Sequence, residues 1–355
     1  MTTTGDRRDA EPLVRLEHVV KEFRVKSAGI FSRTQERVHA VSDVTLDITR
    51  GETLALVGET GCGKSTLARC IVRLHDLTSG RLIFDGQDIS TASQAALRPI
   101  RRRMQMVFQD PYGSLNPRRR VGSIIGDPFD IHGIAQGAER VRRVQQLMEL
   151  VGLNPEHYNR FPGDFSGGQR QRVGIARAIA LEPDFIVCDE PVSALDVSIQ
   201  AQILNLLAEL QEKRGLTYLF ISHDLSVVRH VSDRVAVMYL GAVVEVAPVR
   251  ALFAHARHPY TRALLSAMPV PAAERIGDHE EIILAGDPPS PMDPPGGCRF
   301  HPRCPRATAR CATETPSLVP RLADDADHRT ACHYPLADGE SLLSGRVDGV
   351  LEGQT

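Results

Sequence analysis

Residues 58–66 read GETGCGKST, which matches the pattern G-x-x-x-x-G-K-[ST]. The apolar run before them, ETLALVG, is expected to be a strand, and residues 64–75 have a helical pattern. Between a strand and a helix, such a loop turns its backbone N–H groups inward, and the helix N-terminus adds partial positive charge. The pattern therefore predicts a phosphate-binding loop. Its expected ligands are Gly58, Gly61, Gly63, Lys64, Ser65 and Thr66, with Lys64 on the β- and γ-phosphates and Ser65 on Mg²⁺.

Strand-like and helical segments alternate along residues 13–268. After the strand-like runs within 13–58, further apolar runs occur at 104–109, 185–190, 217–223 and 234–240. Helical patterns occur at 138–152, 167–181, 197–213 and 248–267. This alternation predicts a mainly parallel sheet with helices on its faces. Residues 98–183 are richer in helix than in strand, and we expect them to form an inserted helical subdomain.

The composition narrows the class of protein. An apolar fraction of 42% and a charged fraction of 24% are ordinary for a globular chain. A formal charge of −2 gives no support for nucleic-acid binding. No run approaches the length of apolar sequence that spans a bilayer, and the N-terminal MTTTGDRRDAEP lacks the apolar core of a secretory signal. We expect residence in the cytoplasm, where thiols stay reduced.

An acidic pair follows the apolar strand FIVCDE, at Asp189 and Glu190. At the carboxyl end of a strand beside a phosphate-binding loop, Asp189 is expected to hold Mg²⁺. Glu190 is expected to polarise the water that attacks the γ-phosphate. Alone, such a pair could merely cap a turn.

Further motifs resemble those of the ATP-binding subunits of ABC transporters. SGGQ (Ser166–Gln169) resembles the signature motif, with Phe165 where leucine is usual, and SALD (193–196) resembles the D-loop. Gln109 in VFQDP resembles the Q-loop glutamine, and His223 in ISHD resembles the switch histidine. Phe23 in KEF is a candidate for the aromatic residue that stacks on adenine.

The resemblance implies an α/β fold with a P-loop NTPase core of the ABC ATPase type. It adds an antiparallel β subdomain, the helical subdomain at about 98–183 and a small Cys-rich C-terminal appendage. It also implies a head-to-tail pair of subunits, in which the signature of one closes over the phosphate loop of the other. The residues expected to contact nucleotide this way are Ser166, Gly167, Gly168, Gln169 and Asp196. Glu190, His223, Gln109 and Lys64 are the expected catalytic residues, and Gln109 is expected to sense Mg²⁺.

Within that family, GETGCGKST, VFQDPYGSLNPRRRV and the C-terminal CRFHPRCP resemble the oligopeptide/dipeptide importers, in particular their F-type ATPase subunit. This implies a D-type partner ATPase, two membrane permeases and an extracytoplasmic substrate-binding protein, with no nucleic acid. The chain would then lie at the cytoplasmic face of the membrane. Related importers carry nickel or glutathione, and a soluble ABC ATPase is a further alternative.

The composition also suggests domain boundaries. Residues 1–12 are expected to be flexible, 13–268 to form the nucleotide-binding domain and 269–297 to be a linker rich in proline and glycine. Residues 298–335 would form the Cys-rich region, and 336–355 a tail.

Seven cysteines fall into two groups. Cys62, Cys70 and Cys188 lie in the nucleotide-binding domain, where small apolar filling is expected. The others, Cys298, Cys304, Cys311 and Cys332, are spaced C-x₅-C-x₆-C-x₂₀-C, which chooses neither zinc nor an iron–sulfur cluster. A histidine (His301, His328 or His333) could replace a thiol, and nearby arginines would offset the charge. An incidental set of cysteines is another alternative, whereas the cytoplasm disfavours a disulfide. The family resemblance favours a [4Fe–4S] cluster, with Zn²⁺ as the alternative.

Overall fold

The computed structural model describes residues 11–26, 35–110, 113–268, 282–322 and 326–342. They fall into two compact units. Unit 1 comprises Met1–Val14, Ile48–Thr53 and Phe84–Ser222, and unit 2 comprises Arg15–Asp47, Leu54–Ile83 and His223–Thr355. The expected N-terminal segment, the linker and the tail lie partly outside the described residues. The domain boundaries expected from the sequence stay predictions.

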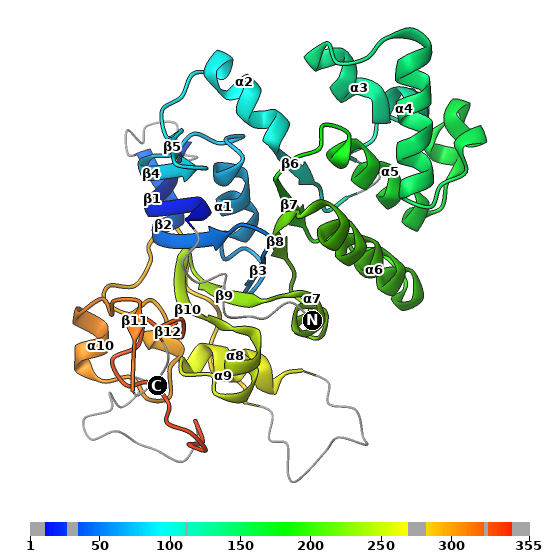
Figure 1. Ribbon diagram of the computed structural model, residues 1–355. Coiled ribbons are helices and arrows are strands. Elements are labelled where there is room, and N and C mark those ends of the chain that lie inside the picture. Colours follow the sequence, from blue (N-terminus) through cyan, green and yellow to red (C-terminus); the bar gives the residue numbers. More distant parts are fainter. Residues whose placement is uncertain (1–10, 27–34, 111–112, 269–281, 323–325, 343–355) are drawn as a thin grey trace. The chain divides into compact units, whose positions relative to one another are not determined.

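Unit 1 combines three parallel strands with a group of helices (Figure 1). Its strands are β5 (Gln87–Asp88), β6 (Met104–Val107), β7 (Phe185–Asp189) and β8 (Thr217–Ile221). Its helices are α2 (Gln94–Arg103), α3 (Val121–His132), α4 (Gly137–Leu150), η1 (Pro155–Asn159), η2 (Pro162–Asp164), α5 (Gly167–Ile179) and α6 (Val197–Arg214).

The strands β6, β7 and β8 lie in that order and are parallel. Val107 pairs with Cys188, and Asp189 pairs with Ile221. Every residue of β7 and β8 is buried, which explains why both read as continuous apolar runs rather than as alternating ones. The strands expected at 104–109, 185–190 and 217–223 are therefore confirmed.

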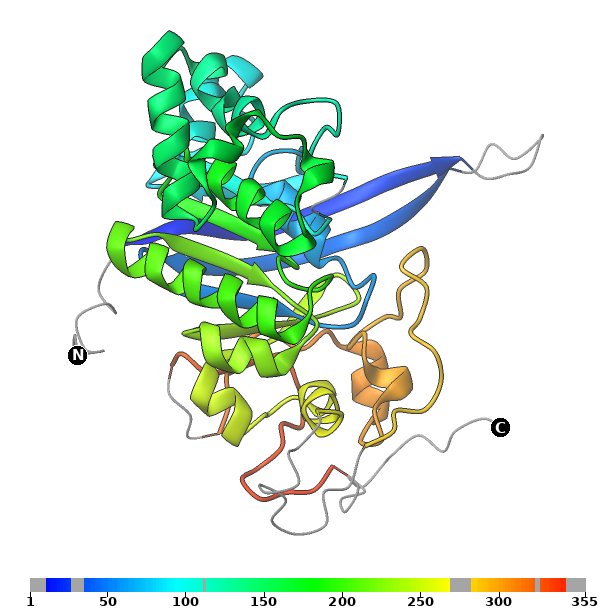
Figure 2. The ribbon, with the colours of Figure 1, turned by 90° about the vertical axis from the view of Figure 1, so that its right-hand side faces the viewer.

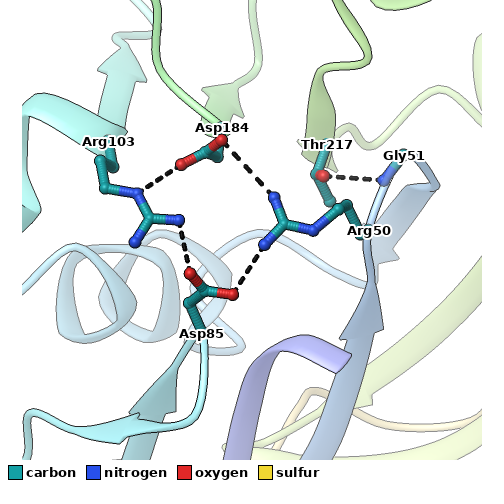
Figure 3. Close-up of polar contacts among 6 residues, drawn as sticks. All are labelled: Arg50, Gly51, Asp85, Arg103, Asp184 and Thr217. Atoms are coloured by element: carbon teal, nitrogen blue, oxygen red, sulfur yellow. Dashed lines mark hydrogen bonds and ion pairs between the residues drawn. The ribbon is translucent and has the colours of Figure 1, made fainter. Parts of the chain in front are cut away.

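Four charged side chains of unit 1 meet at the amino ends of these strands (Figure 3). Arg103 precedes β6 and donates to Asp184 at 2.5 Å and to Asp85 at 2.6 Å. Arg50 contacts the same two carboxylates, at 2.7 Å for Asp85 and 3.5 Å for Asp184. Thr217 at the start of β8 accepts a hydrogen bond from the Gly51 N–H at 2.8 Å. The network joins segments that are far apart in sequence at the edge opposite Gln109 and Glu190.

Unit 2 contains the phosphate-loop motif and the C-terminal region. Its strands are β1 (Pro12–Lys26), β2 (Gln35–Thr49), β3 (Thr53–Val57), β4 (Ser79–Phe84), β9 (Arg234–Tyr239), β10 (Ala242–Pro248), β11 (Val319–Pro320) and β12 (Arg329–Thr330). Its helices are α1 (Lys64–Ile71), α7 (Leu225–Val231), α8 (Val249–Ala254), α9 (Pro259–Ser266), η4 (His301–Arg303) and α10 (Ala309–Thr313).

Two sheets form in unit 2. In the first, β1 lies between β2 and β4, and Figure 2 shows β1 and β2 as a long ribbon. In the second, the order is β11-β12-β10-β9-β3, where β3 and β9 are parallel and the other pairs antiparallel. The pairing of β12 with β10 makes the C-terminal region part of the same sheet as the strand that leads into the phosphate-binding loop.

The helix expected over 248–267 is two helices, and this correction has a local cause. The structure ends α8 at Ala254 and begins α9 at Pro259, the first helical residue. Proline lacks the N–H that a continuing helix needs, and it restricts the residue before it. His258 is the N-cap of α9, and its side chain accepts a hydrogen bond from the Tyr260 N–H at 3.1 Å.

The C-terminal region packs onto the rest of unit 2 through buried groups. Phe300 is 1% exposed and lies against Tyr239 and Tyr260, with ring centroids 5.3 and 5.4 Å away. His328 and Glu245 are both buried, and His328 Nε2 lies 2.7 Å from Glu245 Oε1. The region therefore shares the core of unit 2.

Candidate functional site

The loop after β3 has a backbone that requires glycine at two positions. Gly58 and Gly63 have φ of 150° and 106°. A Cβ on Gly58 would lie 2.1 Å from the Met238 carbonyl oxygen, and one on Gly63 would lie 2.1 Å from that of Ala40. Gly63 is also the N-cap of α1 and offers no side chain that could occupy the helix terminus. The loop thus leaves the N-terminus of α1 open to an anion.

Lys64 begins α1 and folds back over this loop. Its Nζ donates hydrogen bonds to the carbonyl oxygens of Gly58, at 2.7 Å, and Glu59, at 2.9 Å, and the residue is 6% exposed. Phosphate oxygens could replace these neutral acceptors with charged ones, which form stronger hydrogen bonds with an ammonium group. Ser65 and Thr66 follow in the first turn of α1 and are half-buried.

Asp189 and Glu190 lie at the carboxyl end of β7, as the sequence predicts. Asp189 is 2% exposed. Glu190 has a φ of 47°, an uncommon conformation for a residue other than glycine. Its N–H donates to the Ile221 carbonyl at 3.0 Å, and its carbonyl accepts from the Ser193 hydroxyl at 3.1 Å. These bonds fix the direction in which the Glu190 side chain leaves the strand.

Gln109 lies just beyond the end of β6, next to that carboxylate. Its Nε2 donates a hydrogen bond to Glu190 Oε2 at 2.8 Å. The parallel register of β6 and β7 brings the two residues together, because both follow the same edge of the sheet. This is the arrangement expected of a base and the residue that orients it.

The signature motif forms the start of α5. Ser166 is its N-cap: the Ser166 hydroxyl accepts from the Gln169 N–H at 3.3 Å, and Gln169 Oε1 accepts from the Ser166 N–H at 2.9 Å. This reciprocal capping box fixes the helix start. A Cβ on Gly168 would lie 2.4 Å from Cγ2 of Ile199, so this glycine permits close packing against α6. Phe165, in the position usual for leucine, is buried.

The other predicted site residues lie at element boundaries. Asp196 is the exposed N-cap of α6, and His223 is exposed between β8 and α7. Phe23 is half-buried in β1, with its ring edge-on to His75 at 5.4 Å and the Lys21 ammonium 4.8 Å from its centroid. The nucleotide contacts expected of these three residues stay predictions.

Comparison with known proteins decides the family. Residues 41–193 match the family "ABC transporter", and residues 244–311 match "Oligopeptide/dipeptide transporter, C-terminal region". The chain is 51% identical over 324 residues to the oligopeptide transport ATP-binding protein AppF of Bacillus subtilis, a match that covers 91% of this chain and 97% of AppF. The chain belongs to the ATP-binding proteins of ABC transporters.

Other relatives agree with this assignment. The di/tripeptide transport ATP-binding protein DppF of Pseudomonas aeruginosa is 48% identical over 324 residues, covering 91% of this chain and 98% of DppF. Among solved structures, a dimeric ATP-binding cassette in a post-hydrolysis state with ADP and Pi has a TM-score of 0.60 and 31% identity. That match covers 67% of this chain and 99% of the other.

The family assignment confirms the fold class and the enzymatic activity predicted from the sequence. The chain has the P-loop core of an ABC ATPase, and its activity is ATP hydrolysis. In the part of the chain that the structure describes, no helix is long and apolar enough to cross a membrane.

The prediction that the four C-terminal cysteines of this ABC ATPase hold a metal centre is wrong. Cys298, Cys304, Cys311 and Cys332 do line one cavity, together with Phe300 and other residues. However, among the residues that the structure describes, no group of three or more histidine, cysteine or acidic side chains is placed to hold a metal ion. Neither the [4Fe–4S] cluster nor the Zn²⁺ alternative is supported.

The surroundings of these thiols are largely buried. Burial raises the pKa of Cys298, raises that of Cys304 to about 12 and raises that of Cys332, so in the absence of a metal the neutral thiol is the favoured form. The arginines expected to offset thiolate charge contact other groups: Arg299 the Leu240 carbonyl, Arg303 Glu59, Arg306 Glu340 and Arg310 Glu314.

The histidines considered as alternative ligands also contact other groups. His328 pairs with Glu245, His301 Nδ1 lies 2.9 Å from the Cys298 carbonyl oxygen, and His333 Nε2 lies 2.9 Å from that of Glu314. The three cysteines of the nucleotide-binding domain are buried, as expected.

Sequence reasoning missed two residues that contact the phosphate-binding loop. Tyr260 accepts a hydrogen bond from the Glu59 N–H at 2.9 Å, and Arg303 contacts the Glu59 carboxylate at 3.0 Å. One signal was available: an acidic side chain inside a loop that binds anions calls for a cationic partner nearby. The sequence could not have said which of many arginines it is.

Proposed function

We propose that this ABC ATPase powers the uptake of dipeptides and oligopeptides as a peripheral subunit at the cytoplasmic face of a membrane. The observation that carries the proposal is the match of residues 244–311 to the C-terminal region of oligopeptide/dipeptide transporters. The relatives named for oligopeptide and di/tripeptide transport support it, because they match almost along their whole length.

ATP hydrolysis in this proposal uses the residues at the ends of β6 and β7. Glu190 acts as the base that takes a proton from the attacking water, and Gln109 holds the carboxylate through its 2.8 Å hydrogen bond. Lys64 binds the β- and γ-phosphates, and His223 donates to the γ-phosphate. Phe23 stacks on adenine.

The donor set also suits Mg²⁺. A hydroxyl from Ser65, a carboxylate from Asp189 and an amide oxygen from Gln109 are the hard oxygen ligands that Mg²⁺ prefers. The ion would neutralise charge on the phosphates when bound. In the structure, Asp189 is 2% exposed, which suits a carboxylate that works beside a cation.

We further propose a head-to-tail pair of ATPase subunits. The phosphate-binding loop of one subunit would be covered by residues at the starts of α5 and α6 of the other: Ser166, Gly167, Gly168, Gln169 and Asp196. The exposed capping box at the start of α5 supports this, because the N-terminus of a helix is an anion site. The partner would be a D-type paralogue, together with two permeases and an extracytoplasmic substrate-binding protein.

Transport measurement tests the proposal. The tagged chain is purified from membranes with its partners and reconstituted into vesicles, and ATP-dependent uptake of labelled dipeptides and oligopeptides is measured. We expect peptide uptake with the wild-type chain and none with Glu190→Gln, in complexes of unchanged composition. Uptake of nickel or glutathione but not of peptides would contradict the substrate class. A chain that hydrolyses ATP without any membrane partner would favour a soluble ATPase.

A further inference from the structure

The second residue of the phosphate-binding loop, Glu59, is held by the C-terminal region of the same unit. One terminal guanidinium nitrogen of Arg303 lies 3.0 Å from Glu59 Oε1 and 3.1 Å from Oε2. The Arg303 side chain is 10% exposed and the Glu59 side chain 26%. Because the pair is little exposed to water, the removal of one partner costs more than it would in a surface ion pair.

The backbone of Glu59 is fixed as well. Its N–H donates to the Tyr260 hydroxyl at 2.9 Å, and its carbonyl accepts from Lys64 at 2.9 Å. Tyr260 is fully buried, and its ring lies 4.7 Å from that of Tyr239. Groups from α1, α9 and the C-terminal region thus converge on a single residue of the loop.

Arg303 is itself held by this aromatic core. It ends η4, and its N–H donates to the carbonyl of buried Phe300 at 3.0 Å. Nearby, Arg299 donates to the Leu240 carbonyl, and the next residue, Gly241, donates its N–H to the Cys62 carbonyl in the loop at 2.8 Å. The segment 299–303 therefore contacts the loop directly at Glu59 and through one intervening turn at Cys62.

The charge of the Glu59 carboxylate bears on the binding of phosphates to this loop. Glu59 is the one acidic side chain among residues 58–66, and a carboxylate there opposes the approach of a polyphosphate. With Arg303 in place the local charge is balanced. Without it, the loop would carry an unpaired carboxylate beside the site where phosphates bind.

We propose that Arg303 is a positioning residue of the ATP site, which holds Glu59 and cancels its charge so that the loop accepts the phosphates of ATP. The proposal rests on the assignment of residues 58–66 as the phosphate-binding loop. It gives the C-terminal region of this chain a direct effect on nucleotide affinity, through a side chain and not through its thiols.

The experiment measures the dissociation constant of a fluorescent ATP analogue with Mg²⁺ for the full-length chain and four variants. The variants are Arg303→Ala, Glu59→Gln, the double variant Glu59→Gln/Arg303→Ala, and Arg310→Ala as a matched control. Arg310 belongs to the same region but pairs with Glu314 on its own helix. The thermal midpoint of each variant is recorded alongside.

We expect Arg303→Ala to weaken binding by about tenfold, the usual size of one lost charge-assisted contact. Glu59→Gln should bind at least as tightly as the wild type, and the double variant should recover most of the lost affinity. Recovery by removal of the carboxylate separates a charge effect from misfolding, which a second substitution would not repair. Arg310→Ala should bind as the wild type does.

Wild-type affinity in Arg303→Ala, or a double variant as weak as Arg303→Ala, would overturn the proposal while leaving the ATP site intact. If Arg303→Ala does not fold, tighter binding by Glu59→Gln supports the charge effect, and weaker binding contradicts it. A wild-type chain that binds no nucleotide would instead overturn the assignment of the phosphate-binding loop.

Discussion

Gln109 Nε2 donates a hydrogen bond to Glu190 Oε2 at 2.8 Å, although the two residues are 81 positions apart in the chain. The bond directs one carboxylate oxygen toward the Gln109 amide and so fixes the orientation of the Glu190 side chain. An active-site base needs such a fixed direction toward the proton that it takes.

Replacing Glu190 by glutamine should abolish turnover without abolishing binding. The amide cannot take a proton from water, so we expect kcat to fall by about 10²–10⁴-fold, the usual contribution of a general base. Nucleotide affinity should stay within about threefold of wild type, because the substitution keeps the size of the side chain.

Steady-state ATP turnover of the assembled transporter and equilibrium nucleotide binding check this prediction. Gln105→Ala is the matched control, because Gln105 lies in β6 and its side chain donates to the Arg101 carbonyl at 2.5 Å, away from Glu190. Unchanged turnover in Glu190→Gln would remove Glu190 from the role of base.

Replacing Lys64 by arginine should damage nucleotide binding. The Lys64 ammonium is buried and reaches the carbonyls of Gly58 and Glu59 at 2.7 and 2.9 Å, which leaves little room for a planar guanidinium. We expect nucleotide affinity to fall by about tenfold or more. Lys213→Arg is the control, since Lys213 is exposed and pairs with Glu209 on α6. Wild-type affinity in Lys64→Arg would contradict the predicted phosphate contact.

The local motifs were predictable from sequence because their function depends on neighbouring residues. The glycines of residues 58–66 follow from the motif, and so does the position of SGGQ at the start of a helix; the capping box of Ser166 and Gln169 is seen in the structure. The contact between Gln109 and Glu190 needed one further step, the parallel register of β6 and β7. Pro259 in the sequence indicates a break between α8 and α9. The prediction of one helix over 248–267 does not take this proline into account.

Other features depend on burial and on distant contacts, which spacing does not reveal. The family resemblance suggests a cluster, but among the described residues no group of side chains is placed to hold a metal ion, and Arg303 contacts Glu59. Arg303 and Glu59 are 244 positions apart, and tertiary contacts such as the packing of Phe300 against Tyr239 and Tyr260 bring them together.

Replacing Ser166 by alanine should affect activity much more than stability. The Ser166 hydroxyl accepts one hydrogen bond at 3.3 Å, and loss of such a cap costs about 0.5–2 kcal/mol of folding free energy. Ser93→Ala is the matched control, because Ser93 is the N-cap of α2 and accepts from the Ala96 N–H at the same distance, 3.3 Å.

Both variants should therefore lose similar stability in urea unfolding. If Ser166 contacts the nucleotide held by a second subunit, only Ser166→Ala should also lose ATP turnover in the assembled transporter, by about tenfold or more. Equal turnover in the two variants would restrict Ser166 to helix capping.

The charge network of Arg50, Asp85, Arg103 and Asp184 should make stability depend on pH in a predictable direction. The hydrogen bond from Arg103, aided by Arg50, lowers the pKa of Asp85 below its ordinary value of 3.8. A depressed pKa means that the ionised carboxylate stabilises the fold above the unfolded pKa. That stabilisation is lost as the pH falls through the lower pKa of the folded state.

Asp85→Asn removes the ionisable group and therefore this dependence. The difference in thermal midpoint between wild type and Asp85→Asn should be constant from neutral pH to about pH 5 and should shrink as the pH approaches about 3. Asp293→Asn, an exposed position in unit 2, serves as the control. A wild-type advantage that persists undiminished at the lowest pH would show that Asp85 acts through packing or neutral hydrogen bonds. Because Asp85 remains 39% exposed, added salt should also reduce the advantage at neutral pH.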